Sequence, residues 1–121
     1  FSVVMRKGYG LGAMGMTAGG FHSPAFTVAW PSAEFGAMGL EGAVRLGYRK
    51  ELESVPEGPQ REALFERLLA QQVANGAAIQ MATTLEIDAV IDPAQTRDWL
   101  IKGLAGAKVK APSVGRFVDT W

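Results

Sequence analysis

Blocks of apolar residues divide the chain into short strand-like segments and longer helix-like segments. The apolar run FSVVM (1–5) and the β-branched and aromatic run AFTVAW (25–30) both predict buried strands. The second run ends at Pro31, which cannot donate a hydrogen bond to a neighbouring strand. Shorter stretches at 34–38 and 88–91 predict two further strands.

Three later segments have the three- and four-residue apolar spacing of amphipathic helices. Residues 40–52 and 77–85 predict two of them. The clearest pattern spans 59–75, where a proline suits the first turn and the pair Asn75-Gly76 marks the end. Its apolar stripe consists of Phe65, Leu68, Leu69 and Val73. We interpret this stripe as the face of a helix that packs on a sheet.

A final helix is expected after Asp92, which suits the N-cap, and Pro93, which suits the first helical position. The helix is expected to end near Gly106. Its buried side is predicted to consist of Leu100, Ile101 and Leu104. Because strands alternate with helices along the chain, the fold class is predicted to be α/β.

The glycine-rich segment 8–20 is the first candidate for chemistry. Residues 10–15 read GLGAMG, a G-x-G-x-x-G pattern. A dinucleotide-binding turn would need a full helix next and then a second strand that ends in an acid, but a Gly-Gly pair and Pro24 interrupt that stretch. We therefore predict a turn with a short helix that starts near Gly12, where uncovered backbone amides favour a negative oxygen.

Composition narrows the function classes. The chain has 121 residues, enough for one domain at most, with 12 basic and 12 acidic residues and no cysteine. The chain has no run of Lys and Arg of the kind that indicates a surface for binding nucleic acid or membranes. No apolar run approaches the ~18 residues of a membrane span. We expect a soluble, cytoplasmic protein. Because the chain opens directly on an apolar run, we expect it to be the C-terminal part of something longer.

Titratable side chains give weak signals. His22 is the single histidine and is interpreted as a structural or surface residue. Arg6 and Lys7 could attract phosphates or carboxylates, although a solvated cation pair at a strand end is the commoner arrangement. The acidic residues do not share metal-ligand spacing with histidines, so no metal is predicted in this segment.

Three blocks in a fixed order carry a family resemblance. MRKGYGLGAMGM, AWPSAEFGAMGLEGAVRLGYRKEL and EIDAVIDPAQTRDWL span the chain from Met5 to Leu100. In this order they resemble the C-terminal, crotonase-like half of the carboxyltransferase component of biotin-dependent acyl-CoA carboxylases. They are most similar to the "YGLGA" type found in single-chain, multi-domain carboxylases. The resemblance implies a crotonase-like α/β fold, in which residues 1–121 form the C-terminal portion of an incomplete carboxyltransferase C domain.

The resemblance also implies a reaction and a site. The carboxyl group of carboxybiotin would move to the α-carbon of an acyl-CoA through an enolate, with biotin's own N1 as base. The backbone amides of Gly12 and Ala13 would form the oxyanion hole, and an ungapped match shifts this pair to Leu11 and Gly12. Gly10, Leu11 and Gly15 would line the biotin and acyl pocket. Because Gly15 has no side chain, the pocket would tolerate acyl groups bulkier than acetyl.

Cofactors and partners follow from the same resemblance. Biotin would arrive on a carrier domain, and acyl-CoA would be the substrate. The implied partners are the N-terminal carboxyltransferase half and the biotin carboxylase and carrier domains, in a homo-oligomer built as a dimer-based hexamer, without nucleic acid or membrane. Alternatives are a carboxyacyl-CoA decarboxylase, a hydratase or another crotonase-like enzyme, or an assembly segment. We expect the isolated chain to be inactive.

Overall fold

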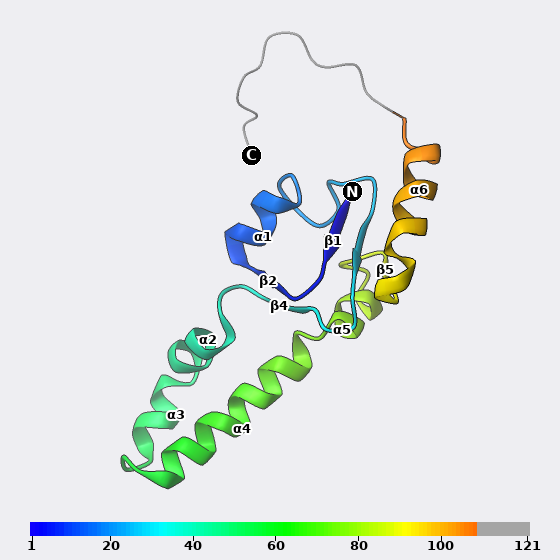
Figure 1. Cartoon of the computed structure of the whole chain (residues 1–121). Coiled ribbons are helices and arrows are strands. Elements are labelled where there is room, and N and C mark those ends of the chain that lie inside the picture. The colour runs from blue at the N-terminus through cyan, green and yellow to red at the C-terminus, as the bar shows by residue number, and fades with distance from the viewer. Residues whose placement is uncertain (109–121) are drawn as a thin grey trace, which may run out of the picture.

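The strands form two small parallel sheets in the computed structural model, which describes residues 1–108 (Figure 1). The first sheet has the order β1-β3-β5, from Ser2–Val4, Thr27–Ala29 and Ala89–Val90. The second pairs β2 (Lys7–Tyr9) with β4 (Glu34–Gly36). Because parallel strands need crossover connections, this topology agrees with the predicted α/β class.

The buried core lies around the central strand β3. All three of its residues are buried, and Ala29 joins Ala33, Phe35, Ala78 and Ile87 in one apolar cluster. The strand predicted at 25–30 is therefore confirmed. The strand predicted at 1–5 is also confirmed, but β1 is half-buried instead of buried, because among the described residues it pairs with β3 alone.

Six α-helices connect and flank these strands within residues 1–108. They are α1 (Gly10–Met16), α2 (Leu40–Gly47), α3 (Arg49–Ser54), α4 (Pro59–Asn75), α5 (Ala78–Thr83) and α6 (Thr96–Gly106). Helices α2, α3 and α4 form an arm that extends away from the sheets (Figure 1). No helix in the described part of the chain combines the length and apolar character needed to cross a membrane.

The arm has its own small apolar core. Val44, Leu52 and Leu68 are buried there, with Leu69 packed against them. The expectation that α4 packs on a sheet is therefore wrong. A short connection reverses the chain between α3 and α4, so that the apolar stripe of α4 meets α2 and α3. Val73, at the far end of the stripe, is 40% exposed.

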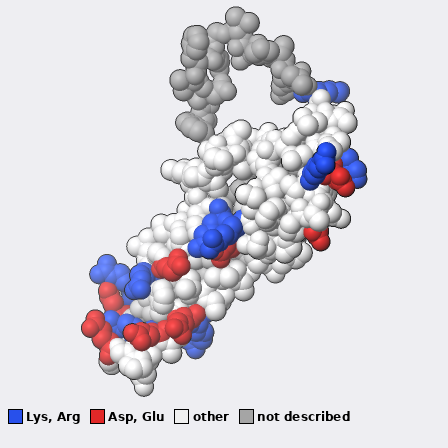
Figure 2. Space-filling model, in the orientation of Figure 1, with Lys and Arg blue, Asp and Glu red and all other residues white. Residues whose placement is uncertain are grey.

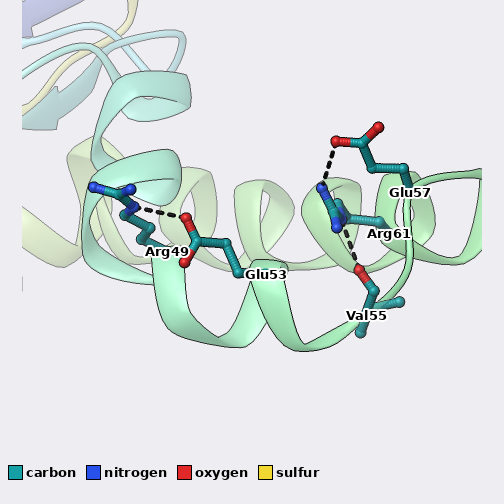
Figure 3. Close-up of polar contacts among 5 residues, drawn as sticks. All are labelled: Arg49, Glu53, Val55, Glu57 and Arg61. Carbon is teal, nitrogen blue, oxygen red and sulfur yellow. Dashed lines mark hydrogen bonds and ion pairs between the residues drawn. The ribbon is translucent and has the colours of Figure 1, made fainter.

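Arg61 holds the connection between α3 and α4 (Figure 3). Its Nε donates a 2.8 Å hydrogen bond to the Val55 carbonyl oxygen, and its Nη1 lies 3.2 Å from the Glu57 carboxylate. In the neighbouring pair, Arg49 and Glu53, both side chains are exposed, and 2.7 Å separates Nε from Oε1. The Val55 contact is therefore the one that ties the loop to α4.

Arg61→Ala is expected to lower the free energy of unfolding by about 1 kcal/mol, because the Val55 carbonyl loses a partly buried, charge-assisted hydrogen bond. Glu57→Ala serves as the matched control, since the Glu57 side chain is 90% exposed and such pairs contribute only a few tenths of a kcal/mol. Urea unfolding of both variants measures the difference. Equal losses would contradict the role given to the Val55 contact.

The last helix begins as predicted but turns a different face inward, and that face is half-buried. The Asp92 carboxylate accepts a 2.8 Å hydrogen bond from the Ala94 amide and caps a short 3₁₀ turn, η1 (Pro93–Gln95), ahead of α6. Ile101 and Leu104, which were predicted to be buried, are 53% and 67% exposed. The inward face instead includes Trp99, Leu100 and Gly103. Gly103 leaves space for the Phe26 ring. Trp99 packs edge-on against this ring, with the two ring centres 5.7 Å apart.

Candidate active site

The glycine-rich segment forms a strand followed directly by a helix. Strand β2 was not predicted, because the interpretation as a turn started at Gly8. Gly8 is buried, and a Cβ there would lie 3.3 Å from both Phe35 and Val4. Gly10 has φ +52°, and its Cβ would lie 2.6 Å from the Ala37 carbonyl oxygen. A side chain at Gly10 is therefore excluded by conformation and by space, and α1 starts there, two residues before the expected position.

The first turn of α1 leaves backbone amides without intrahelical acceptors. In a helix that begins at Gly10, these are the amides of Gly10, Leu11 and Gly12. The amide of Ala13 is the first with a regular i−4 acceptor, the Tyr9 carbonyl. Gly12 is exposed, and a Cβ built on it would meet no atom within 4 Å. The amide at Gly12 is thus approachable.

Two cavities flank α1 and divide the predicted site residues between them. Gly12 and Ala13 line a cavity of about 670 Å³ that extends along β1 and the start of β2. Gly10, Leu11 and Ala13 line a second cavity of about 650 Å³, which reaches α2 and the end of α4. Gly15 lines neither of them, and it is exposed. The structure therefore brings four of the five predicted residues to cavities and leaves Gly15 outside.

The first cavity has a positive lining. Arg6 and Lys7 contribute to it, and no carboxylate of the described residues does. The Nζ atom of Lys7 lies 3.5 Å from the Glu34 carboxylate, which is outside this lining, and 5.7 Å from the centre of the Tyr9 ring. Lys7 is exposed, as the sequence suggested, and it lies close to these two partners.

Tyr9 lines the same cavity, and its hydroxyl stays protonated far above neutral pH. The pKa of Tyr9 is raised to about 12, first by burial, then by a hydrogen bond and charge repulsion from Glu34, with a smaller contribution from Glu41. At neutral pH this phenol is a hydrogen-bond donor and not a base. Sequence reasoning missed Tyr9, because the residue gains its surroundings only when β2 pairs with β4.

Tyr9→Phe is expected to remove a phenolate step centred near pH 12 from an ultraviolet absorbance titration. The folded-state pKa is above the unfolded value of about 10. Tyr9 therefore stabilises the fold fully below about pH 10, and this contribution is lost as the pH rises towards 12. Unfolding followed across this window should show a shallower decline for Tyr9→Phe. A variant with an unchanged titration would contradict the assignment.

The other titratable candidates do not gather at α1. His22 is exposed, and its Nε2 lies 3.7 Å from the Glu86 carboxylate, as expected for a surface histidine. Within residues 1–108, no three His, Asp or Glu side chains lie close enough together to hold a metal ion.

The surface over α1 is largely uncharged. On the face drawn in Figure 2, charged side chains gather over the arm and beside α6, and the region of α1 is mostly free of them. Two apolar side chains of α1 are strongly exposed: Leu11 at 82% and Met16 at 85%. Positive charge near the site therefore comes from the start of β2 and not from the helix itself.

Comparison with known proteins places this geometry in a family. The carboxyl transferase domain family matches residues 1–114. The biotin-dependent acetyl-/propionyl-coenzyme A carboxylase beta6 subunit of Mycobacterium tuberculosis is 34% identical over 110 residues, covering 90% of this chain and 23% of that protein. The methylmalonyl-CoA carboxyltransferase 12S subunit of Propionibacterium freudenreichii is 36% identical over 96 residues, covering 79% and 18%. The chain therefore spans less than a quarter of these curated relatives.

Solved structures of similar proteins support the same family assignment. A single-chain, multi-domain long-chain acyl-CoA carboxylase is 51% identical, with a TM-score of 0.70 over 83% of this chain and 9% of that chain. The hexameric transcarboxylase 12S core, solved with methylmalonyl-coenzyme A and methylmalonic acid bound, is 30% identical, with a TM-score of 0.76 over 95% and 22%. These matches confirm the crotonase-like α/β class. The chain belongs to the carboxyl transferase domain family.

Proposed function

We propose that residues 1–121 form the C-terminal portion of a carboxyltransferase C domain in a biotin-dependent acyl-CoA carboxylase. The enzyme would transfer the carboxyl group of carboxybiotin to the α-carbon of an acyl-CoA. The observation that carries this proposal is the open first turn of α1 beside the 670 Å³ cavity, which is lined by Arg6 and Lys7 without a carboxylate of the described residues. Such a lining favours an anionic reactant.

Carboxybiotin, when bound, supplies the carboxyl group, and the residues of α1 fit a negatively charged oxygen beside it. We assign the Gly12 amide as the central donor of this oxyanion hole, whereas the Ala13 amide, which the resemblance implies as the second donor, has the Tyr9 carbonyl as its helical acceptor. The helix position supports Gly12 most strongly, since it lies in the first turn and has open space around it. The shifted pair, Leu11 and Gly12, includes the same central donor.

The side chains of this cavity stabilise charge and do not remove protons. Arg6 and Lys7 are cationic, and the Tyr9 phenol stays protonated up to about pH 12. A hydratase would need positioned carboxylates that activate water, and none of the described residues supplies one in this lining. These features favour stabilisation of an enolate or ureido anion over addition of water.

We extend the proposal to substrate and assembly. A long-chain acyl-CoA carboxylase is among the similar structures, so the substrate would be an acyl-CoA bulkier than acetyl-CoA. The partners would be the N-terminal carboxyltransferase half and the biotin carboxylase and carrier domains, in a dimer-based hexamer. The absence of cysteine fits a cytoplasmic location. Alone, the chain would provide half of the site and no activity.

Carboxyl transfer to biocytin tests the proposal. The complete polypeptide that carries this chain is incubated with malonyl-CoA or methylmalonyl-CoA, and carboxybiocytin is measured. Biotin-dependent transfer supports the proposal. Release of CO₂ at the same rate without biocytin would assign a decarboxylase, and no transfer from any carboxyacyl-CoA would overturn the assignment.

A further inference from the structure

A cavity on the arm, the arm cavity, brings three arginine side chains together. Its volume is about 430 Å³, within the range of small-molecule sites. Arg45 of α2, Arg49 of α3 and Arg61 of α4 all contribute to its lining. The arm cavity shares no lining residue with either cavity beside α1, so it is a separate feature of the molecule.

Arg45 is held in the wall by an aromatic ring and not by a carboxylate. Its guanidinium carbon lies 4.5 Å from the centre of the Phe65 ring, which is the distance of a cation–π contact. None of the ion pairs within residues 1–108 involves Arg45. The ring therefore orients this side chain while its charge stays available to an anion.

The two other arginines already bind carboxylates and retain further donors. Arg49 Nε donates a 2.7 Å hydrogen bond to Glu53, and Arg61 Nη1 donates a 3.2 Å hydrogen bond to Glu57 (Figure 3). Arg61 Nε donates to the Val55 carbonyl oxygen. A guanidinium has five N–H donors, of which these contacts use one in Arg49 and two in Arg61. Both side chains can therefore bind a second acceptor.

The charge of the arm cavity fits one carboxylate. Within the described part of the chain, its lining contains three arginines and two acidic residues, Glu53 and Glu62. The lining therefore has an excess of one positive charge. A single carboxylate balances this excess, whereas a phosphate group with up to two negative charges exceeds it. Arginine also binds a carboxylate through two parallel hydrogen bonds.

The floor of the arm cavity is apolar. Leu52 and Phe65 both line it. Leu52 is buried with Val44 and Leu68, and Phe65 packs against this cluster. A ligand gains affinity by burying an apolar body on this floor while its charged end meets the arginines. The lining therefore selects an organic acid with a compact apolar or aromatic body.

We propose that the arm cavity binds a small organic acid, with its carboxylate at Arg45 and Arg49 and its apolar body on Leu52 and Phe65. Glu53 is then an internal competitor, because its carboxylate lies 2.7 Å from Arg49 Nε. Since the arginines come from three helices, a bound acid connects α2, α3 and α4. The inference does not depend on carboxyl transfer at α1.

Benzoate binding to the complete polypeptide that carries this chain tests the site, with uncharged benzamide as the control ligand. Saturation-transfer NMR measures both dissociation constants. Arg45→Gln is expected to weaken benzoate binding about tenfold, the effect of losing one hydrogen bond between charged groups. Benzamide should bind about tenfold more weakly than benzoate for the same reason. Arg67→Gln is the matched control, because it removes an exposed arginine of α4 outside the lining.

Glu53→Gln has the opposite expected effect, which a loss of folding cannot imitate. Removing the competing charge should strengthen benzoate binding about threefold, the usual scale of an exposed ion pair. Glu66→Gln makes the same change at an exposed position of α4 outside the lining, and it should leave the affinity unchanged. Unchanged or weaker binding in Glu53→Gln would overturn the proposal.

Hydrogen exchange locates the bound acid. Exchange of the arm amides should slow when benzoate is added to the unmodified protein, because a bound ligand opposes local opening of the helices that it connects. Arg45→Gln should need about tenfold more benzoate for the same protection, in line with its weaker binding. Equal benzoate affinity in Arg45→Gln and Arg67→Gln would remove the site. Tighter binding of inorganic phosphate than of benzoate to the same amides would overturn the assignment of a carboxylate.

Discussion

Gly12→Pro is expected to lower kcat for carboxyl transfer by about 10²- to 10³-fold, the usual cost of losing one oxyanion-hole donor. Proline has no N–H to offer the developing negative oxygen. Because Gly12 lies in the first turn of α1, its amide has no intrahelical acceptor, and proline there breaks no helical hydrogen bond. The KM for acyl-CoA should change little, since the interaction strengthens in the transition state.

Gly12→Ala is the matched control. It keeps the amide, and the added methyl group would meet no atom of the described residues within 4 Å. Its kcat is expected to stay within a few-fold of the unmodified enzyme. Equal losses in the alanine and proline variants would mean that bulk, and not the amide, matters at this position. Circular dichroism and thermal unfolding of each variant establish that the fold is retained.

Leu11→Pro decides between the two possible donor pairs. Leu11 is also in the first turn, so proline there again removes an amide without an intrahelical acceptor. If Leu11 and Gly12 are the donors, kcat falls as it does in Gly12→Pro. If Gly12 and Ala13 are the donors, Leu11→Pro retains most of the activity. In both cases Gly12 is the shared donor, so the first variant is the stricter test of the site.

Long periodic segments were predictable because local signals agree with packing. The helix at 59–75 has the expected bounds, since a proline opens it, the pair Asn75-Gly76 closes it and its stripe has helical spacing. The strand at 25–30 was also predictable, because β-branched and aromatic residues fill a buried central position. In both segments, local preference and tertiary burial favour the same structure.

Elements that depend on distant partners were less predictable. Strand β2 contains three residues, one of them glycine, and it exists because its backbone pairs with β4. The partner of the α4 stripe depended on how the chain reverses at 55–58, which apolar spacing does not encode. The buried side of α6 depended on where Gly103 meets Phe26. In each element, long-range contact decided the outcome.

The sequence predicted where the backbone amides of the candidate site lie. It did not predict the cavities and charged groups around them. The glycines at 10–15 located the turn, because backbone amides near glycine are uncovered whatever the side chains around them. The division of Gly12 and Leu11 between two cavities needed the positions of β1, α2 and α4. The protonated state of Tyr9 likewise depended on Glu34, which lies on the neighbouring strand.

Gly76→Ala is expected to lower the free energy of unfolding by about 3 kcal/mol, the upper end of the usual cost of overpacking. Gly76 is buried where α4 ends, and its carbonyl accepts a 2.8 Å hydrogen bond from the Phe35 amide. A Cβ at Gly76 would overlap the Phe35 carbonyl oxygen and lie 3.3 Å from that of Gln72. These are backbone atoms, so rotation of a side chain cannot relieve the overlap.

Gly47→Ala is the matched control for this stability test. Gly47 is the last residue of α2, and a Cβ there would meet nothing within 4 Å. Alanine in a helix is intrinsically favoured over glycine, so this variant should be neutral or more stable by up to about 1 kcal/mol. Urea unfolding compares the two variants. A loss below about 0.5 kcal/mol for Gly76→Ala would contradict the close approach of α4 to β4, a threshold set by the usual effect of surface substitutions.

The same substitution connects stability with the site. Phe35 lies on β4, which pairs with β2, and β2 leads directly into the first turn of α1. Displacing Phe35 would therefore shift the strand that positions the Gly12 amide. Hydrogen exchange at the Phe35 amide, whose acceptor is the Gly76 carbonyl, should accelerate in Gly76→Ala and stay unchanged in Gly47→Ala. Carboxyl transfer should fall with the loss of protection, because an oxyanion donor must be held in place before the reaction begins.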